Sequence, residues 1–207
     1  MLISGLYKFS TVNYPSKFSC VLFLKGCACN CDYCYNKQLL YSDCIDEKEV
    51  RNFLESRVGL LDAIVFSGGE PMYQINDLLP WCQYVKSLGF LVGLHTTGYN
   101  CNNPKFGEII KLCDWVGLDF KAPSYKYVQV CGRDFDIFEN SLPLVRAVPS
   151  YEIRTTLNDK LTKEDLLVMR KYLDDNGVGT WYLQRQLKDG SFCTPPFKLD
   201  IPNTKVR

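Results

Sequence analysis

Hydrophobic and polar residues follow two alternating patterns along the chain, and each pattern predicts a different element. Short runs rich in β-branched and aromatic residues predict strands, whereas apolar residues spaced three or four positions apart predict helices. The runs place strands at Phe18–Leu24, Ala63–Ser67, Phe90–Thr96, Trp115–Phe120, Tyr151–Leu157 and Thr180–Gln186. The helical spacing covers Asp46–Gly59, Ile75–Leu88, Pro104–Cys113, Asp136–Val148 and Thr162–Asn176. Strands that alternate with helices in this way predict an α/β fold, in which helices cover a parallel sheet.

The two faces of the predicted strands differ in polarity. Residues two apart in a strand share a face, and one face carries this polar set towards the carboxyl ends: Ser67, Gly69, His95, Thr97, Asp119, Lys121, Arg154, Thr156, Gln184 and Gln186. Both faces of an open parallel sheet are covered by helices and would be apolar. The polar face therefore predicts a barrel-like curl with a functional site at the carboxyl ends of its strands. Polar side chains satisfied within an ordinary core are the alternative.

The composition narrows the class of protein. A chain of 207 residues with 46% hydrophobic content can bury one full core, so we expect a single domain over residues 1–207, with 187–207 as a proline-bearing C-terminal tail. The formal net charge of +1 gives no reason to expect general nucleic-acid binding or an anionic membrane surface as a partner. The start of the chain lacks the pattern of a signal peptide, and no apolar run approaches the roughly 20 residues of a membrane span. These features predict a soluble, cytoplasmic protein.

The cysteines carry the first candidate chemistry. Their total of eleven is odd, and an intracellular chain of this size needs no disulfides, so thiolate chemistry is the better explanation. Cys27, Cys31 and Cys34 stand at C-x3-C-x2-C spacing in one loop after the first predicted strand. A [4Fe–4S] cluster normally takes four cysteine ligands, so three would leave one iron open for a substrate or cofactor. Cys29 is offset from these three, which favours a bystander role.

A glycine-rich turn after the second predicted strand is the other candidate. Its sequence is Ser67-Gly68-Gly69-Glu70-Pro71. Two glycines let the backbone approach a ligand closely, and the carboxylate of Glu70 could hold an ammonium group. Turns of this kind are common, so the motif gains its meaning from the cysteine loop before it.

Together the two motifs resemble the radical S-adenosylmethionine superfamily. The resemblance implies that Cys27, Cys31 and Cys34 bind a [4Fe–4S] cluster whose fourth iron is chelated by S-adenosylmethionine. It also implies that Tyr33 contacts the adenine and that the turn Ser67, Gly68, Gly69 and Glu70 receives the methionine amino group. In that superfamily an electron entering the cluster cleaves the cofactor and releases a 5′-deoxyadenosyl radical.

A narrower resemblance covers most of the chain. The segments Gly5–Pro15, Gly117–Pro123, Glu152–Thr156 and Trp181–Gln184 look like the glycyl-radical enzyme activating enzymes, above all the activating proteins of anaerobic ribonucleoside-triphosphate reductase. The resemblance implies a partial (β/α)6 barrel with parallel strands. It also implies a glycyl-radical enzyme, such as that reductase, as partner and a flavodoxin- or ferredoxin-type electron donor. The cofactor contacts implied on the strands are Thr97, Asp119, Lys121, Arg154 and Gln184.

The chain departs from those relatives after the third predicted strand. It has His95-Thr96-Thr97-Gly98 where they usually have Asp-Thr-Asn-Gly, so the acid that can bind the ribose in the relatives is replaced. His95 is the single histidine of the chain, and both a structural and a functional role fit its position. The segment Val130–Arg133 follows the fourth predicted strand on a loop that could meet the substrate.

The sequence supports three functions. The first is an activase that generates a glycyl radical on a partner enzyme. The second is a radical S-adenosylmethionine enzyme that acts on a peptide, nucleoside or other small molecule. The third is an iron–sulfur or zinc module without S-adenosylmethionine chemistry, although a structural zinc site would need a fourth ligand that the sequence does not reveal.

Overall fold

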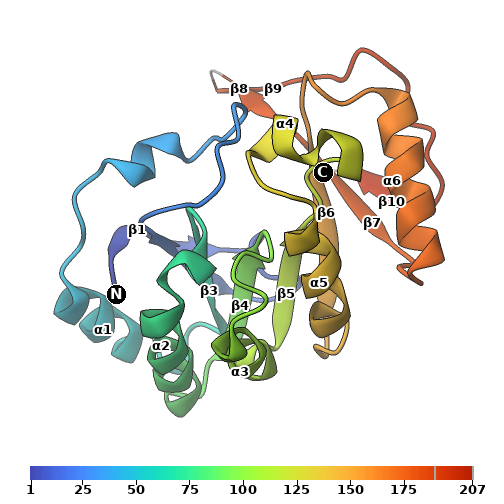
Figure 1. The fold of residues 1–207 in the computed structure, drawn as a ribbon. Coiled ribbons are helices and arrows are strands. Elements are labelled where there is room, and N and C mark those ends of the chain that lie inside the picture. The colour runs from blue at the N-terminus through green and yellow to red at the C-terminus, as the bar shows by residue number, and fades with distance from the viewer. Residues whose placement is uncertain (189, 207) are drawn as a thin grey trace.

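The computed structural model describes residues 1–188 and 190–206, and within them eight strands form one sheet (Figure 1). The strands predicted from the sequence are present as β2 (Ser19–Leu24), β3 (Ala63–Gly68), β4 (Leu91–Thr96), β5 (Trp115–Asp119), β6 (Tyr151–Leu157) and β7 (Trp181–Arg185). They lie side by side in chain order, and each is parallel to the next. The predicted α/β fold with a parallel sheet is confirmed.

Both edges of the sheet carry strands that the sequence analysis missed. β1 (Ile3–Ser10) pairs antiparallel with β2, and β10 (Thr204–Val206) pairs in parallel with β7. The segment expected to be a tail also forms a small hairpin of β8 (Leu187–Lys188) and β9 (Ser191–Phe192). Asp189 and Arg207, which belong to the same predicted tail, lie outside the described residues. The end of the chain is therefore partly built into the fold.

The helices connect successive strands. They are α1 (Glu47–Glu55), α2 (Ile75–Ser87), α3 (Pro104–Leu112), α4 (Tyr127–Cys131), α5 (Asp136–Val145) and α6 (Lys163–Asp175), together with 3-10 turns at Lys37–Leu40, Pro71–Gln74 and Ser124–Lys126. The side chain of Thr162 accepts from the backbone of Asp165, whose carboxylate in turn accepts from the backbone of Thr162, so α6 opens with the expected capping box. The short helix α4 has no counterpart in the sequence analysis.

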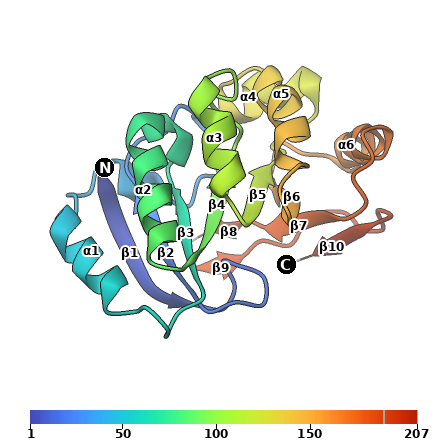
Figure 2. The same cartoon turned by 90° about the horizontal axis from the view of Figure 1, so that it is seen from below.

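The sheet curls so that its two faces have different neighbours. Figure 2 shows the strands along an arc that does not close, with α2, α3 and α5 on its outer side. The main core lies between this outer face and the helices, and it includes Phe66, Leu94, Leu118 and Ile153. The structure is therefore the partial, open barrel that the polar strand face predicted.

The amino-terminal end of the inner face is filled by a separate apolar cluster. Tyr14, from the loop between β1 and β2, packs there with Val21, Ala63, Val65 and Trp115. The rings of Tyr14 and Trp115 lie 5.5 Å apart between centroids. The polar residues of the inner face come later along the strands, so they lie at the carboxyl ends, beyond this apolar cluster. None of the described helices is both long and apolar enough to cross a bilayer.

Candidate metal centre and cofactor site

The cysteine loop runs from the end of β2 to the 3-10 turn at Lys37, and the glycine-rich turn after β3 packs directly against its start. The backbone amide of Glu70 donates to the carbonyl oxygen of Gly26 over 2.9 Å. A Cβ atom on Gly69 would lie 2.0 Å from the same oxygen, and one on Gly68 would lie 2.3 Å from the backbone nitrogen of Leu24. Both glycines are therefore required for the close contact between turn and loop.

The thiols of the loop differ in their protonation. Cys29 lies within hydrogen-bonding reach of Cys27, Cys31 and Cys131. Its hydrogen bond lowers the pKa of Cys27, and it lowers the pKa of Cys31 to about 6, with a further contribution from the charge of Lys121. Burial, by contrast, raises the pKa of Cys34. Iron requires thiolate ligands, so the surroundings of Cys27 and Cys31 suit a metal centre.

The donor set fits an iron–sulfur cluster by its chemistry. Cys27, Cys31 and Cys34 are soft sulfur ligands of the kind that iron–sulfur clusters use. Within the described part of the chain, no three or more His, Cys, Asp or Glu side chains are grouped so that they could hold one metal ion. Ligands of a cluster each bind a different iron and need not converge on one point, so the arrangement is compatible with a cluster.

The middle of the cysteine loop is held from the far side by the residues that end α4. The amide of Asn30 donates to the carbonyl oxygen of Cys131 over 2.8 Å, and Arg133 Nε donates to the carbonyl oxygen of Ala28 over 2.5 Å. We call Cys131–Arg133 the α4 clamp. The segment Val130–Arg133, expected on a loop that could meet the substrate, includes this clamp and so contacts the cysteine loop. No spacing signal pointed to this contact.

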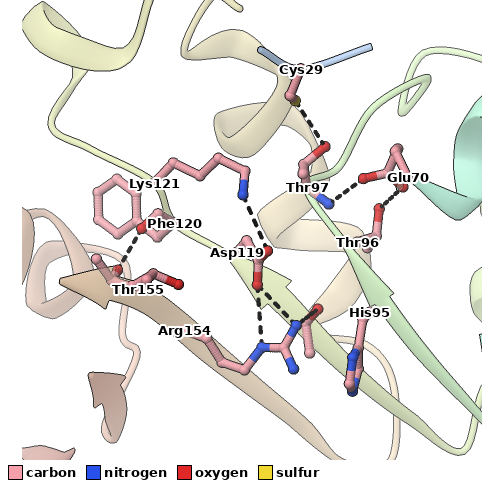
Figure 3. Close-up of polar contacts among 12 residues, drawn as sticks. Cys29, Glu70, His95, Thr96, Thr97, Asp119, Phe120, Lys121, Arg154 and Thr155 are labelled. Carbon is pink, nitrogen blue, oxygen red and sulfur yellow. Dashed lines mark hydrogen bonds and ion pairs between the residues drawn. The ribbon is translucent and has the colours of Figure 1, made fainter. Parts of the chain in front are cut away.

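Three charged side chains meet at the carboxyl ends of β5 and β6 (Figure 3). Arg154 donates to Asp119 Oδ1 from Nε over 3.2 Å and from Nη2 over 2.9 Å, and Lys121 Nζ lies 3.3 Å from Asp119 Oδ2. The two strands are in register at Asp119 and Arg154. A side chain at Gly117 would overlap the guanidinium, with a Cβ only 2.6 Å from Arg154 Cζ. This glycine therefore makes room for Arg154, a role visible only in the folded sheet.

Asp119 and the cations Lys121 and Arg154 stabilise one another's charged forms. Burial alone would raise the pKa of Asp119, but Lys121 and Arg154 outweigh it and hold that pKa below its usual value. Burial would likewise lower the pKa of Lys121, yet its neighbours Tyr33 and Asp119 hold it well above the usual value. The ammonium of Lys121 lies 5.9 Å from the centre of the Tyr33 ring. The charged group of Asp119, Lys121 and Arg154 therefore lies next to the cysteine loop.

Gln184 lies farther along the sheet. It is half-buried on β7 and in register with Thr156 of β6, the strand that also carries Arg154. Its position on the polar inner face agrees with the predicted alternation.

Glu70, which the resemblance places in the turn that receives the methionine amino group, has a buried carboxylate in the structure. Its side chain is fully buried, and its oxygens accept hydrogen bonds from the Thr96 hydroxyl (2.7 Å) and the Thr97 amide (2.7 Å), as Figure 3 shows. The Met72 amide donates a third hydrogen bond to the carboxylate over 3.0 Å. Burial raises the pKa of Glu70, and these hydrogen bonds oppose the rise. The carboxylate ties the turn after β3 to the end of β4 and has no exposed surface for an ammonium group. A ligand contact at this position would have to use the backbone.

Thr97 contacts both the buried carboxylate of Glu70 and the cysteine loop. While its amide binds Glu70, its hydroxyl oxygen lies 3.9 Å from the sulfur of Cys29. Cys29, interpreted from its spacing as a bystander, therefore links Cys27 and Cys31 to both Thr97 and the α4 clamp.

His95 and Ser67 form a pair on the inner face. Ser67 Oγ lies 3.1 Å from His95 Nδ1, and His95 Nε2 lies 3.1 Å from the carbonyl oxygen of Asn13. The imidazole meets the Trp115 ring edge-on with centroids 5.3 Å apart. Burial, followed by the charge of Arg154, lowers the pKa of His95 to about 3. The imidazole is therefore neutral at physiological pH.

A groove of about 620 Å³ opens beside the cysteine loop. Its walls come from three parts of the chain: the loop itself (residues 32–35), the segment between β6 and α6 (158–160), and the start of the C-terminal segment (186–188 and 190). Lys160 crosses one side of it and forms an ion pair of 2.6 Å with Asp32. Tyr33 and Cys34 are among the residues that line this groove.

Comparisons with known proteins agree with this geometry. Residues 17–124 match the family model described as a 4Fe-4S single cluster domain. A Methanocaldococcus jannaschii protein assigned as a glycyl-radical enzyme activating enzyme is 34% identical over 148 residues, which are 68% of this chain and 60% of that protein. The pyruvate formate-lyase-activating enzyme of Clostridium pasteurianum is 30% identical over 131 residues, 57% of this chain and 53% of that protein.

A solved structure shares the fold. Native anSMEcpe with bound AdoMet, which is S-adenosylmethionine, superposes with a TM-score of 0.63 at 17% identity, over 77% of this chain and 48% of that one. At this identity the likeness shows the fold alone. The chain spans between about half and 60% of the length of these three proteins.

Proposed function

Because the chain belongs to the 4Fe-4S single cluster domain family and to the radical S-adenosylmethionine superfamily, we propose that it is an activase of glycyl-radical enzymes. Its cofactors are a [4Fe–4S] cluster and S-adenosylmethionine. When bound, they supply an electron and a carbon radical strong enough to remove a hydrogen atom from a glycine α-carbon. The protein has to hold the cofactors, keep water away and admit the partner's glycine.

The cysteine loop would hold the cluster. Within the loop, the pKa values of Cys27 and Cys31 are lowered, and Cys34 completes the predicted ligand set. The contact of Gly69 with Gly26 and the α4 clamp fix the loop from two sides. A ligand loop fixed in this way keeps its geometry through a change of cluster charge.

The charged group on β5 and β6 would orient S-adenosylmethionine. Lys121 stays cationic because its pKa is raised, and it faces Tyr33 on the cysteine loop. It is thus suited to bind the carboxylate of the methionine moiety, while Tyr33 offers a ring for the adenine. In this proposal Arg154 and Asp119 position Lys121, and Thr97 and Gln184 are further contacts along the rim.

The groove beside the cysteine loop is the observation that carries the activase proposal. A volume of about 620 Å³ next to Tyr33 and Cys34 can admit an extended segment of another protein. The two curated relatives described above are both named as activating enzymes. Anaerobic ribonucleoside-triphosphate reductase is the partner that we propose, with a flavodoxin- or ferredoxin-type protein as electron donor. The free thiols of the chain suit a cytoplasmic location.

The test is formation of a glycyl radical. Reconstituted and reduced protein, mixed with S-adenosylmethionine and the anaerobic ribonucleotide reductase of the same genome, should give the doublet resonance of a glycyl radical. One 5′-deoxyadenosine should form for each radical. Cys31→Ala should abolish both products, and Cys44→Ala, which changes an exposed cysteine, should leave them unchanged. Formation of 5′-deoxyadenosine without a radical on any glycyl-radical enzyme of that genome would reject the activase and favour a small-molecule substrate.

A further inference from the structure

The hydrogen bonds around His95 fix the position of the hydrogen on the Ser67 hydroxyl. The carbonyl oxygen of Asn13 can only accept, so the imidazole nitrogen facing it, Nε2, must carry the hydrogen. A neutral imidazole has one N–H, and Nδ1 is therefore an acceptor. Ser67, the partner of Nδ1, must donate its hydroxyl hydrogen to it.

The neutral state of the ring is built into its surroundings. The imidazole packs against the edge of Trp115, and the guanidinium of Arg154 approaches from β6. Both the apolar contact and the nearby cation oppose protonation, in agreement with a pKa of about 3. The direction of the hydrogen bond from Ser67 to His95 is therefore the same throughout the physiological pH range.

This direction decides what Ser67 can offer to a ligand. With its hydrogen committed to His95, the hydroxyl has only lone pairs left for a further partner on the inner face. Ser67 is half-buried on the inner face, two residues before the glycine that touches the cysteine loop. An ammonium group can only donate hydrogen bonds, so it is the complementary partner. The carboxylate of Glu70, by contrast, is buried and already bonded.

We propose that His95 is a positioning residue that makes the Ser67 oxygen a dedicated hydrogen-bond acceptor for the ammonium group of S-adenosylmethionine. The inference rests on the proposed function, because it concerns the cofactor of that activity. It gives His95 a role in the position where relatives usually carry an acid. In this proposal a neutral hydroxyl, oriented by a neutral imidazole, accepts a hydrogen bond from the ammonium.

Equilibrium binding to the cluster-loaded protein under anaerobic conditions tests this assignment. Ser67→Ala and His95→Phe should each weaken S-adenosylmethionine binding by about tenfold, the usual effect of one hydrogen bond to a charged group. In a double-mutant cycle, His95→Phe should have no further effect in the Ser67→Ala background, because His95 acts through Ser67. An analogue of S-adenosylmethionine with hydrogen in place of the amino group should bind wild type and all variants equally.

A conservative variant separates orientation from mere packing. His95→Asn places an amide oxygen near the position of Nδ1 and removes the bond to Asn13, so it should keep S-adenosylmethionine affinity within about threefold of wild type. Iron content and visible absorbance confirm that each variant carries its cluster. If His95→Phe does not fold, His95→Asn and Ser67→Ala still give the comparison.

Several results would overturn the inference. Additive losses in the double mutant would mean that His95 does not act through Ser67. Equal losses for the amino-free analogue would mean that the ammonium is not the group recognised. Unchanged S-adenosylmethionine binding in Ser67→Ala would remove the serine contact. Each of these results leaves the proposed function standing, which fails instead if the cluster-loaded wild type binds no S-adenosylmethionine or forms no glycyl radical.

Discussion

Cysteines in this chain divide by their surroundings. Burial raises the pKa of Cys20 to about 12 and raises that of Cys113 well above its usual value, so these thiols behave as small apolar residues of the core. Cys29, which lies within hydrogen-bonding reach of both, lowers the pKa values of Cys27 and Cys31. The same residue type thus packs the core in one place and has a lowered pKa, which suits a metal ligand, in another.

Replacement of one ligand should remove the cluster. Cys31→Ala leaves two of the predicted ligand thiols, so iron after anaerobic reconstitution should fall from about four atoms per chain to below one. The reduced-state resonance of a [4Fe–4S] cluster should disappear with it. Cys44→Ala is the matched control, since this thiol is exposed. Retention of full iron by Cys31→Ala would assign the cluster to other thiols, with Cys29 the nearest candidate.

The buried imidazole should make stability depend on pH. The pKa of His95 is about 3 in the folded chain and about 6.5 when unfolded, so the unfolded state binds more protons between these values. The free energy of unfolding should therefore fall as pH falls through this window. Arg154 and Asp119 face the ring from β6 and β5, with opposite effects on its pKa, and the effect of Arg154 is the larger.

Urea unfolding at pH 7.5 and 5.5 measures this effect. The wild type should lose about 1 kcal/mol more between the two pH values than His95→Gln, in which the side chain does not titrate. Parallel losses in the two proteins would show that His95 is not the group responsible.

Among the elements, the short helix α4 matters more for the metal centre than its length suggests. It delivers Arg133 to Ala28, a contact between residues 105 positions apart in the chain. Such a contact has no local signature, so sequence patterns did not reveal it. The same holds for Glu70, whose partners Thr96 and Thr97 lie on the next strand. Glycine and glutamate motifs indicated where the site lies, but not which groups face the ligand.

Loosening the α4 clamp should speed up loss of the cluster. Arg133→Gln removes the guanidinium that binds the Ala28 carbonyl, so iron should be released to a chelator about fivefold faster, as expected for one lost hydrogen bond. Arg146→Gln is a close control, because Arg146 also donates to a backbone carbonyl, that of Asn176, at a site remote from the cysteine loop. Equal release rates for the two variants would mean that the clamp does not hold the loop.

The central strands were predictable because their signals are local. β2 to β7 appear within a residue or two of their predicted bounds, and the faces of β3 to β6 follow the expected alternation. β1 was missed because Tyr7 and Phe9 are exposed and break the pattern of a half-buried strand. β10 is three residues long, and only its pairing with β7 defines it as a strand.

On the scale of the whole molecule, the segment after β7 contributes to both the core and the sheet. After the small hairpin it returns past α6, where Lys163 and Asp200 form an ion pair of 2.6 Å, and Ile201 enters the main core. β10 then covers the edge of β7. Proline content predicted a tail, and the core contact of Ile201 was missed because this apolar residue stands among polar neighbours in the sequence.

Ile201→Ala should therefore destabilise the protein. The side chain is 6% exposed, and its truncation should lower the free energy of unfolding by about 2 kcal/mol. Phe192→Ala, in the same segment but 67% exposed, should change it by less than about 0.5 kcal/mol. Urea titration of both variants measures the free energy of unfolding. A small loss for Ile201→Ala, similar to that for Phe192→Ala, would show that the segment adds little to the core.

The order of strands in the sheet has a consequence for how the chain acquires its structure during synthesis. From β1 to β7 each new strand is laid beside the one made just before it, so most of the sheet can grow as the ribosome extends the chain. The cysteine loop leaves the ribosome early, but its second support, the α4 clamp, follows about one hundred residues later. Insertion of the cluster should therefore be favoured once the residues of the α4 clamp have been made, and β10 can pair with the edge of β7 only after the rest of the sheet is in place.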